Sequence, residues 1–297
     1  MAFACLAGNG AASHQALLLA HSLRAFGGRW SSAPMLGLVA EGVALDADVE
    51  RGLKDSDVQL VSYALDPALG AVPLAERAAG AARAEGTAER MARLLAWLDS
   101  DSLVLREPTG LLIPPAARIG CRPVDLRLVG SRWDEAPDAF WESIYSGCGV
   151  DREAIFPVRT TVEGDAIRAY FNAGCLVVRP EAGLLRRWRE AVVRLAGGEF
   201  FQGLGGRQKL FFHQAVLAGA VLAAVRPEEI AELPSQANYP LHLHERMPPD
   251  RRSASLRELD TCRYESVLDS EDWARRIPVD EDLRSWLEAR RPLAQGG

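Results

Sequence analysis

Two aspartates separated by one residue are the strongest candidates for chemistry in this sequence. Asp99 and Asp101 follow an apolar run at residues 94–98, and a second apolar run begins at Leu103. If the backbone is extended here, residues two apart point to the same side, so both carboxylates can face one ligand. Carboxylate oxygens suit a hard divalent cation such as Mg²⁺ or Mn²⁺. Water and phosphate oxygens would complete its shell, so the pair predicts metal-assisted departure of a diphosphate.

Other interpretations of the same spacing exist. Aspartate is common in turns, so the pair could simply end a strand. A phosphatase of the haloacid-dehalogenase type also places Asp-x-Asp after an apolar strand, with the first aspartate as nucleophile. That motif usually lies near the start of a domain and continues with Gly-Thr or a similar pair. Here Ser102-Leu103 follow, about a hundred residues into the chain, which argues against this class.

The elements before the pair alternate between strand and helix. We expect strands at 3–7, 35–39 and 58–63, a helix that Ser13 caps and Gly27-Gly28 ends, helices at 46–54 and 74–85, a short helix from Thr87, and a strand ending at Asp99. Such alternation predicts a parallel, right-handed, doubly wound sheet. Ligands of these sheets bind at the carboxyl ends of the strands, where the two aspartates would lie.

The second half is less regular, because four prolines interrupt the residues that follow Asp101. We expect a helix at 138–150, a strand at 175–178 entered through Asn172-Ala173-Gly174, helices at 184–195 and 208–217, and a charged helix at 281–290. No linker or repeat divides the chain. We therefore predict one domain over residues 1–297, with 266–297 as a helical extension.

Composition excludes several classes of protein. The formal net charge of −6 argues against general attraction to nucleic acid or an anionic membrane. No apolar run approaches the roughly 20 residues that span a bilayer. The first residues lack the pattern of a signal peptide, and the five cysteines have no metal-ligand spacing. These features lead us to expect a cytoplasmic protein with free thiols.

Three stretches resemble nucleotide-sugar glycosyltransferases of the GT-A fold, particularly the glycogenin-like and galactosyltransferase-like group. They are "AWLDSDSLVLREP", "YFNAGCLVVRPEAGLLRRWREAV" and "FFHQAVLAGAV" with the following "ELPSQANYP". The opening strand and helix are also similar, so the resemblance spans roughly residues 3–265. It implies a three-layer α/β/α fold with a mainly parallel central sheet.

The resemblance also implies roles for individual residues. Asp101 would bind Mn²⁺ or Mg²⁺, and Asp99 would bind the metal or the donor's ribose. Gln214 would lie beside the reacting sugar. Its neighbour His213, which departs from the group's pattern, is a candidate catalytic residue as a base. The residues that would line the donor site are Ala7, Gly8 and Asn9 at the base, and Asn172, Ala173 and Gly174 at the sugar.

The sequence departs from the group at two places. The helix that usually contains Asp-Gln-Asp has His213-Gln214-Ala215 instead. The group's third metal ligand is a histidine, for which His242 and His244 are candidates because they share one face if that segment is a strand. In the other alignment Arg263 takes this position and binds the diphosphate as a bidentate cation. The need for a metal is therefore left open.

The expected function is transfer of a sugar from a nucleoside-diphosphate sugar, with UDP-sugars favoured, to an unknown acceptor. The resembled group retains the anomeric configuration, whereas an inverting enzyme needs a base, for which His213, His242 or Glu245 could serve. Two alternatives are a sugar-phosphate nucleotidyltransferase and a non-catalytic nucleotide-sugar binding protein. The absence of a basic residue in "AGNGAASHQ" argues against the first.

Overall fold

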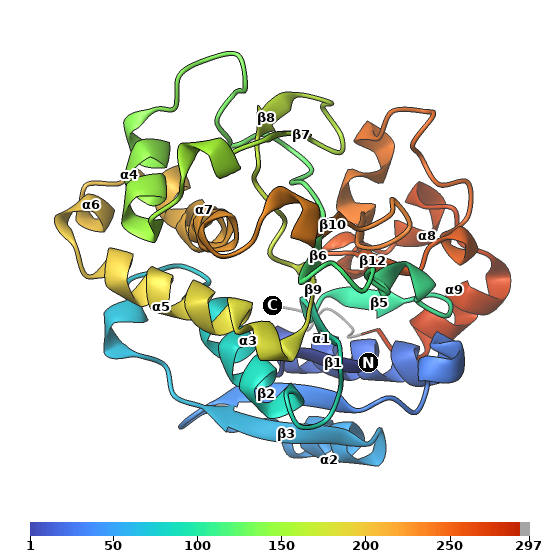
Figure 1. The fold of residues 1–297 in the computed structure, drawn as a ribbon. Helices are drawn as coiled ribbons and strands as arrows, with labels where there is room; N and C mark the ends of the chain where they lie inside the picture. The colour runs from blue at the N-terminus through green and yellow to red at the C-terminus, as the bar shows by residue number, and fades with distance from the viewer. Residues whose placement is uncertain (292–297) are drawn as a thin grey trace.

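The computed structural model describes residues 1–291. Within this range its helices are α1 (Ala11–Phe26), α2 (Ala47–Asp55), α3 (Ala75–Ala88), α4 (Ala139–Cys148), α5 (Leu184–Ala196), α6 (Glu199–Gln202), α7 (Gly206–Ala224), α8 (Trp273–Arg276) and α9 (Glu281–Glu288). Its strands are β1 (Ala2–Leu6), β2 (Met35–Ala40), β3 (Val58–Tyr63), β4 (Leu95–Leu98), β5 (Ser102–Val104), β6 (Ile119–Cys121), β7 (Pro157–Arg159), β8 (Ala166–Arg168), β9 (Cys175–Val178), β10 (Ile230–Glu232), β11 (Tyr239–Pro240) and β12 (Thr261–Arg263). Figure 1 shows how these elements are arranged.

The central sheet has seven strands in the order β10-β6-β9-β4-β1-β2-β3. Its pairings are parallel except those of β9, which runs antiparallel to both β4 and β6. Helices cover both faces, and the chain therefore has the expected three-layer α/β/α architecture with a mainly parallel sheet (Figure 1). The reversed β9 matters for the site, because it brings the residues before β9 to the carboxyl end of β4.

Side chains of β1 alternate between the two faces of the sheet, as the pleat of a strand requires. Phe3 and Cys5 pack in one apolar cluster with residues of α1 and α2. Ala2 and Ala4 pack in the other cluster, which contains residues of α3, α5 and α7. Both faces of the sheet are thus buried, as is usual for strands joined by crossover helices.

Helix α3 is held close to its neighbours by its composition and by one buried carboxylate. Its alanines are small, so the helix approaches both the sheet and α5 closely. Glu85, which is fully buried, accepts hydrogen bonds from the backbone N–H groups of Leu185 and Arg186 at the start of α5, both at 3.0 Å. This contact fixes α3, which carries Arg77 toward the site described below.

A second, three-stranded sheet has the order β11-β12-β5. A third apolar cluster packs against it and includes residues of α1, α8 and α9. The predicted extension at 266–297 contributes to this cluster through residues such as Trp273 and Leu287, and its last six residues, 292–297, lie outside the described range. Among the described helices, none has the length and apolar character needed to cross a membrane.

The structure corrects three local expectations. A single helix, α3, replaces the two predicted between 74 and the next strand, and Gly10 rather than Ser13 precedes α1. The segment Leu241–Arg246 is a 3₁₀ helix, so His242 and His244 do not share one strand face.

Candidate active site

Asp99, Ser100 and Asp101 form the connection between the two sheets. The chain leaves the seven-stranded sheet at the end of β4 and enters the three-stranded sheet at Ser102. The side chain of Asp99 is 4% exposed. Ser100 donates a hydrogen bond to Gln15 of α1 at 3.2 Å. Both aspartates therefore lie at the carboxyl end of β4, as the apolar run before them predicted.

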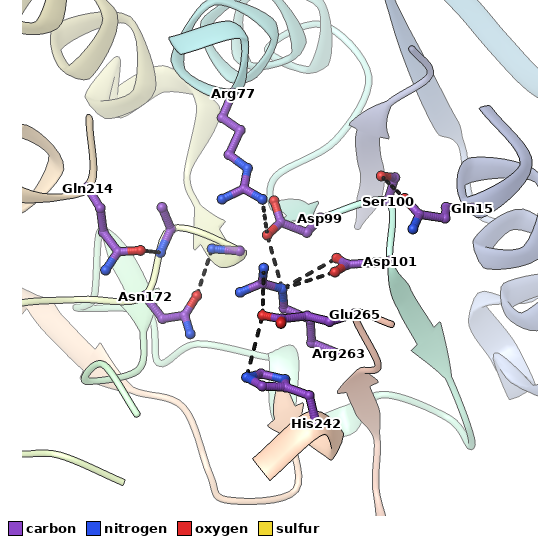
Figure 2. A network of polar contacts seen from close by, with 12 residues as sticks. Gln15, Arg77, Asp99, Ser100, Asp101, Asn172, Gln214, His242, Arg263 and Glu265 are labelled. Carbon is purple, nitrogen blue, oxygen red and sulfur yellow. Dashed lines mark hydrogen bonds and ion pairs between the residues drawn. The ribbon is translucent and has the colours of Figure 1, made fainter. Parts of the chain in front are cut away.

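The turn before β9 lies directly beside Asp99 because β9 is antiparallel to β4. The backbone N–H of Asp99 donates to the carbonyl of Gly174 at 2.8 Å. Asn172 accepts from the N–H of Gly174 at 2.8 Å and donates to Asp125 at 3.1 Å. The Asn172-Ala173-Gly174 segment is thus a rigid turn in contact with the aspartate motif (Figure 2).

Position 174 has room for glycine alone. A Cβ atom there would lie 2.6 Å from an oxygen of Asp99 and 3.1 Å from the side-chain oxygen of Asn172. Real Cβ atoms do not approach oxygens as closely as the first distance. Gly174 therefore allows the turn to touch Asp99, and any larger residue would displace that carboxylate.

Two arginines meet the aspartate pair (Figure 2). Arg77 Nη2 lies 3.1 Å from Asp99 Oδ2. Arg263 Nε lies 3.3 Å from Asp101 Oδ2 and 3.4 Å from Asp99 Oδ2, and its Nη2 lies 3.1 Å from Glu265. The guanidinium of Arg263 therefore stands between the two carboxylates that were predicted to share a metal ion.

Burial and neighbouring charges shift the pKa values of Asp101 and Arg263 in opposite directions. Burial raises the pKa of Asp101 to about 6, although Arg263 opposes this rise. Burial also lowers the pKa of Arg263, but the carboxylates of Asp99 and Asp101 outweigh it and raise the pKa overall. Near neutral pH Asp101 is thus ionised and Arg263 is firmly charged.

Two cavities share Arg77 as a lining residue. The first has a volume of about 410 Å³ and is lined by Gly8, Asn9, Tyr63, Asp99 and Asp101, among others. The second, of about 250 Å³, is lined by residues from several segments, including Asp125, Asn172, His213, Gln214 and Arg263. Leu74 and Arg77 line both cavities, so the two spaces adjoin.

Helix α7 brings His213 and Gln214 to the second cavity. Gln214 accepts from the backbone N–H of Ala173 at 3.4 Å. His213 is 1% exposed, and its ring nitrogens have no hydrogen-bond partner among the described residues. Burial lowers the pKa of His213 to about 3, so the ring is neutral and a weak base.

The predicted metal ligands do not assemble into one site. His242 reaches the second cavity, but its Nε2 lies 3.4 Å from Glu265. His244 is buried elsewhere, with Nδ1 2.9 Å from the hydroxyl of Tyr239. No cluster of three or more His, Cys, Asp or Glu suited to a metal occurs within residues 1–291. The 3₁₀ turn separates the two histidines, and Arg263 is paired with the carboxylates, so the residues present do not fit the expected metal.

Some of the other predicted site residues do not line either cavity. Ala7 and Ala173 are fully buried and do not line the cavities, so only their backbone groups are close to the site. Glu245, a candidate base, is exposed and lies 3.8 Å from Arg276. Gly8 and Asn9 line the first cavity, and Asn172 and Gln214 line the second.

Three residues of the site were not identified from sequence. Arg77 lies in an alanine-rich helix and carries no motif. Asp125 follows β6 and has a pKa that burial raises, with Arg122 opposing the rise. Glu265 is two residues beyond Arg263, and this spacing is the one signal that could have linked it to the site.

A sequence model of the Rhodobacterales glycosyltransferase domain matches residues 3–223. The chain belongs to this family. It is therefore a glycosyltransferase, which agrees with the class expected from its motifs. No curated protein sequence matches the chain.

Solved structures of similar fold agree with the GT-A assignment. The galactosyltransferase LgtC in complex with donor and acceptor sugar analogs superposes on this glycosyltransferase with a TM-score of 0.52 at 14% identity, covering 99% of this chain and 98% of LgtC. A variant of LgtC with an active-site glutamine replaced by glutamate gives a TM-score of 0.53 at the same identity and coverage. At this identity the likeness concerns the fold alone.

Replacing Gly174 tests the close contact with Asp99. Gly174→Ala should lower the rate of donor hydrolysis about tenfold or more, because the added Cβ displaces the Asp99 carboxylate. Gly86→Ala is the matched control, since nothing lies within 4 Å of a Cβ at that helical position. The rates of donor hydrolysis of the two variants provide the comparison. Equal rates would show that the placement of Asp99 does not matter.

The raised pKa of Asp101 predicts a pH-dependent cost in stability. The folded-state pKa of Asp101, about 6, exceeds the usual 3.8, so folding favours the protonated carboxyl. The contribution of Asp101 to the free energy of unfolding is therefore complete below pH 3.8 and is lost as pH rises through 6. Asp101→Asn, which cannot ionise, should therefore unfold with a free energy about 1–3 kcal/mol higher than wild type at pH 8. This difference in the free energy of unfolding between Asp101→Asn and wild type should shrink toward pH 4.

Urea unfolding at pH 8, 6 and 4 measures this difference. Asp250→Asn serves as control, because Asp250 is exposed and its replacement should give no pH-dependent gain. A gain for Asp101→Asn that is constant with pH would contradict the assigned pKa.

Proposed function

We propose that this glycosyltransferase moves a sugar from a nucleoside-diphosphate sugar to an acceptor hydroxyl, with UDP-sugars as the favoured donors. The observation that carries the proposal is the pair of adjoining cavities that meet at Arg77, next to Asp99 and Arg263. A donor of this class has a nucleoside at one end, a sugar at the other and a negative diphosphate between them. The first cavity, the two arginines and the second cavity match that order.

The first cavity would hold the nucleoside. Gly8 and Asn9 follow β1, and Tyr63 ends β3, so all three lie at the carboxyl ends of parallel strands. Nucleotides bind at this edge in open α/β sheets. Asp99 and Asp101 line the same cavity, where a carboxylate is a suitable acceptor for ribose hydroxyls.

The second cavity would hold the donor sugar. Asn172, Gln214 and His213 offer amide and imidazole groups, which exchange hydrogen bonds with hydroxyls without adding charge. The unpartnered ring nitrogens of His213 leave buried polar atoms that a sugar hydroxyl would satisfy. LgtC supports a role for Gln214, because a glutamine is named as part of the active site of that protein.

The reaction breaks the bond between the anomeric carbon and the diphosphate oxygen, whose electron pair leaves with the diphosphate, and forms a bond from that carbon to the acceptor oxygen. The proton of the acceptor hydroxyl passes to the departing diphosphate. Negative charge grows on the departing diphosphate, and cations placed beforehand at this point lower the barrier. Arg77 lines both cavities, and Arg263 lines the second beside Asp99 and Asp101, so the two arginines would supply this charge. Metal assistance, expected from the aspartate motif alone, is not part of this proposal.

Retention of the anomeric configuration is included in the proposal. An inverting enzyme requires a base beside the acceptor hydroxyl. Gln214, the side chain proposed to lie beside the reacting sugar, is not basic, and burial makes the adjacent His213 a weak base, which leaves Asp125 as the carboxylate to test. The product anomer, observed by NMR, tests this part. An inverted product, lost in an Asp125→Asn variant, would contradict retention and identify Asp125 as the base.

The acceptor is proposed to be a carbohydrate. LgtC, which shares the fold, was solved with donor and acceptor sugar analogs. A hydroxyl of such an acceptor would approach the donor sugar in the second cavity.

A panel of nucleoside-diphosphate sugars tests the proposal directly. A UDP-sugar should raise the melting temperature in proportion to its concentration over its dissociation constant, and should be hydrolysed slowly without acceptor. Gln214→Ala should lower hydrolysis about tenfold or more while UDP still stabilises the protein, because Gln214 lines the sugar cavity only.

Gln202→Ala is the control for that variant, since Gln202 is an exposed glutamine of the short helix α6. It should hydrolyse the donor at the wild-type rate. No shift with any donor would overturn the proposed function, and equal rates for the two glutamine variants would remove Gln214 from the sugar site.

A further inference from the structure

The guanidinium of Arg263 lies where the aspartate motif would otherwise hold a cation. Its Nε is 3.3 Å from one oxygen of Asp101, 3.4 Å from the other and 3.4 Å from Asp99 Oδ2. Its side chain is 19% exposed, so the contact is largely shielded from water. One positive group thus contacts both carboxylates of the motif (Figure 2).

Backbone pairing fixes Arg263 at this position. Strand β12 runs antiparallel to β5, and Arg263 is directly opposite Ser102, the residue that follows Asp101. The N–H of Tyr264 also donates to the carbonyl of Asp101 at 3.0 Å. The arginine is therefore built into the sheet beside the motif, unlike a long surface side chain that happens to reach it.

The same arrangement disfavours a divalent ion. Mg²⁺ requires near-octahedral oxygen ligands, and Mn²⁺ also prefers carboxylate, carbonyl and water oxygens. Here both oxygens of Asp101 face Arg263, and Asp99 Oδ2 faces Arg77 and Arg263. A divalent cation between the carboxylates would have to displace Arg263 and would be repelled by both guanidiniums.

We propose that this glycosyltransferase needs no divalent cation, because Arg263 and Arg77 bind the donor diphosphate in place of a metal. The inference rests on the proposed nucleotide-sugar donor. Arginine suits this task, since its planar fork pairs with phosphate oxygens in a bidentate manner and stays charged. The Nη1 of Arg263 donates no hydrogen bond to any residue within 1–291, which leaves it available to a phosphate oxygen.

The carboxylates acquire a different function in this arrangement. Asp99, Asp101 and Glu265 surround Arg263 and fix the direction of its fork. His242 in turn lies 3.4 Å from Glu265. Asp101 and Glu265 thus act as positioning residues for Arg263 instead of binding a metal.

The decisive experiment measures UDP-sugar hydrolysis and UDP binding by the full-length enzyme after treatment with EDTA and gel filtration. Both should stay within about twofold of the untreated protein, and added Mn²⁺ or Mg²⁺ should change neither beyond that. Arg263→Ala should weaken UDP binding about tenfold or more, because a charge-assisted bidentate contact is lost. Arg263→Lys should recover part of that loss through charge alone.

Arg257→Ala is the matched control for these variants. Arg257 also pairs with a carboxylate, Asp280 at 2.7 Å, but neither residue lines the two cavities. UDP binding by this variant should equal that of wild type. The EDTA comparison on wild type stands even if Arg263→Ala fails to fold.

The outcomes separate the two claims. Activity that EDTA abolishes and Mn²⁺ restores would overturn this inference while leaving the donor assignment intact. Binding that is equal in wild type and a folded Arg263→Ala variant would also overturn it. The absence of binding and hydrolysis with every donor, with and without metal, would overturn the proposed function itself.

Discussion

The repulsion between two buried carboxylates is the constraint on which this site depends. Asp99 and Asp101 are 4% and 13% exposed, and two like charges in such a place cannot both ionise without compensation. Arg263 and Arg77 supply it, and the pKa of Asp101 is still raised to about 6 by burial. Burial of these charged groups thus lowers the stability of the fold, as is common at functional sites.

The topology provides the compensation. The motif joins the two sheets, so β9 brings the Asn172 turn to one side of it and β12 brings Arg263 to the other. The buried contact of Glu85 with α5 holds α3, which carries Arg77. Residues that are more than 150 positions apart therefore meet because of strand pairing, and Figure 2 shows their convergence.

Patterns within short segments predicted much of this arrangement. The apolar run before Asp99, the alternation of elements and the position of Asn172 before a strand all follow from local periodicity. The antiparallel β9 and the pairing of β12 with β5 could not be predicted, since they depend on contacts between distant segments. For the same reason Arg77 and Asp125 were missed. The prediction that His242 and His244 are metal ligands assumed a strand, but this segment is a 3₁₀ helix.

A crystal structure with UDP and Mn²⁺, with data recorded at the manganese edge, would show whether the two arginines take the place of a metal ion at the diphosphate. We expect the diphosphate to contact Arg77 and Arg263 beside the two cavities, with no anomalous peak between Asp99 and Asp101. A manganese peak bridging the two aspartates, with Arg263 displaced from them, would contradict this expectation.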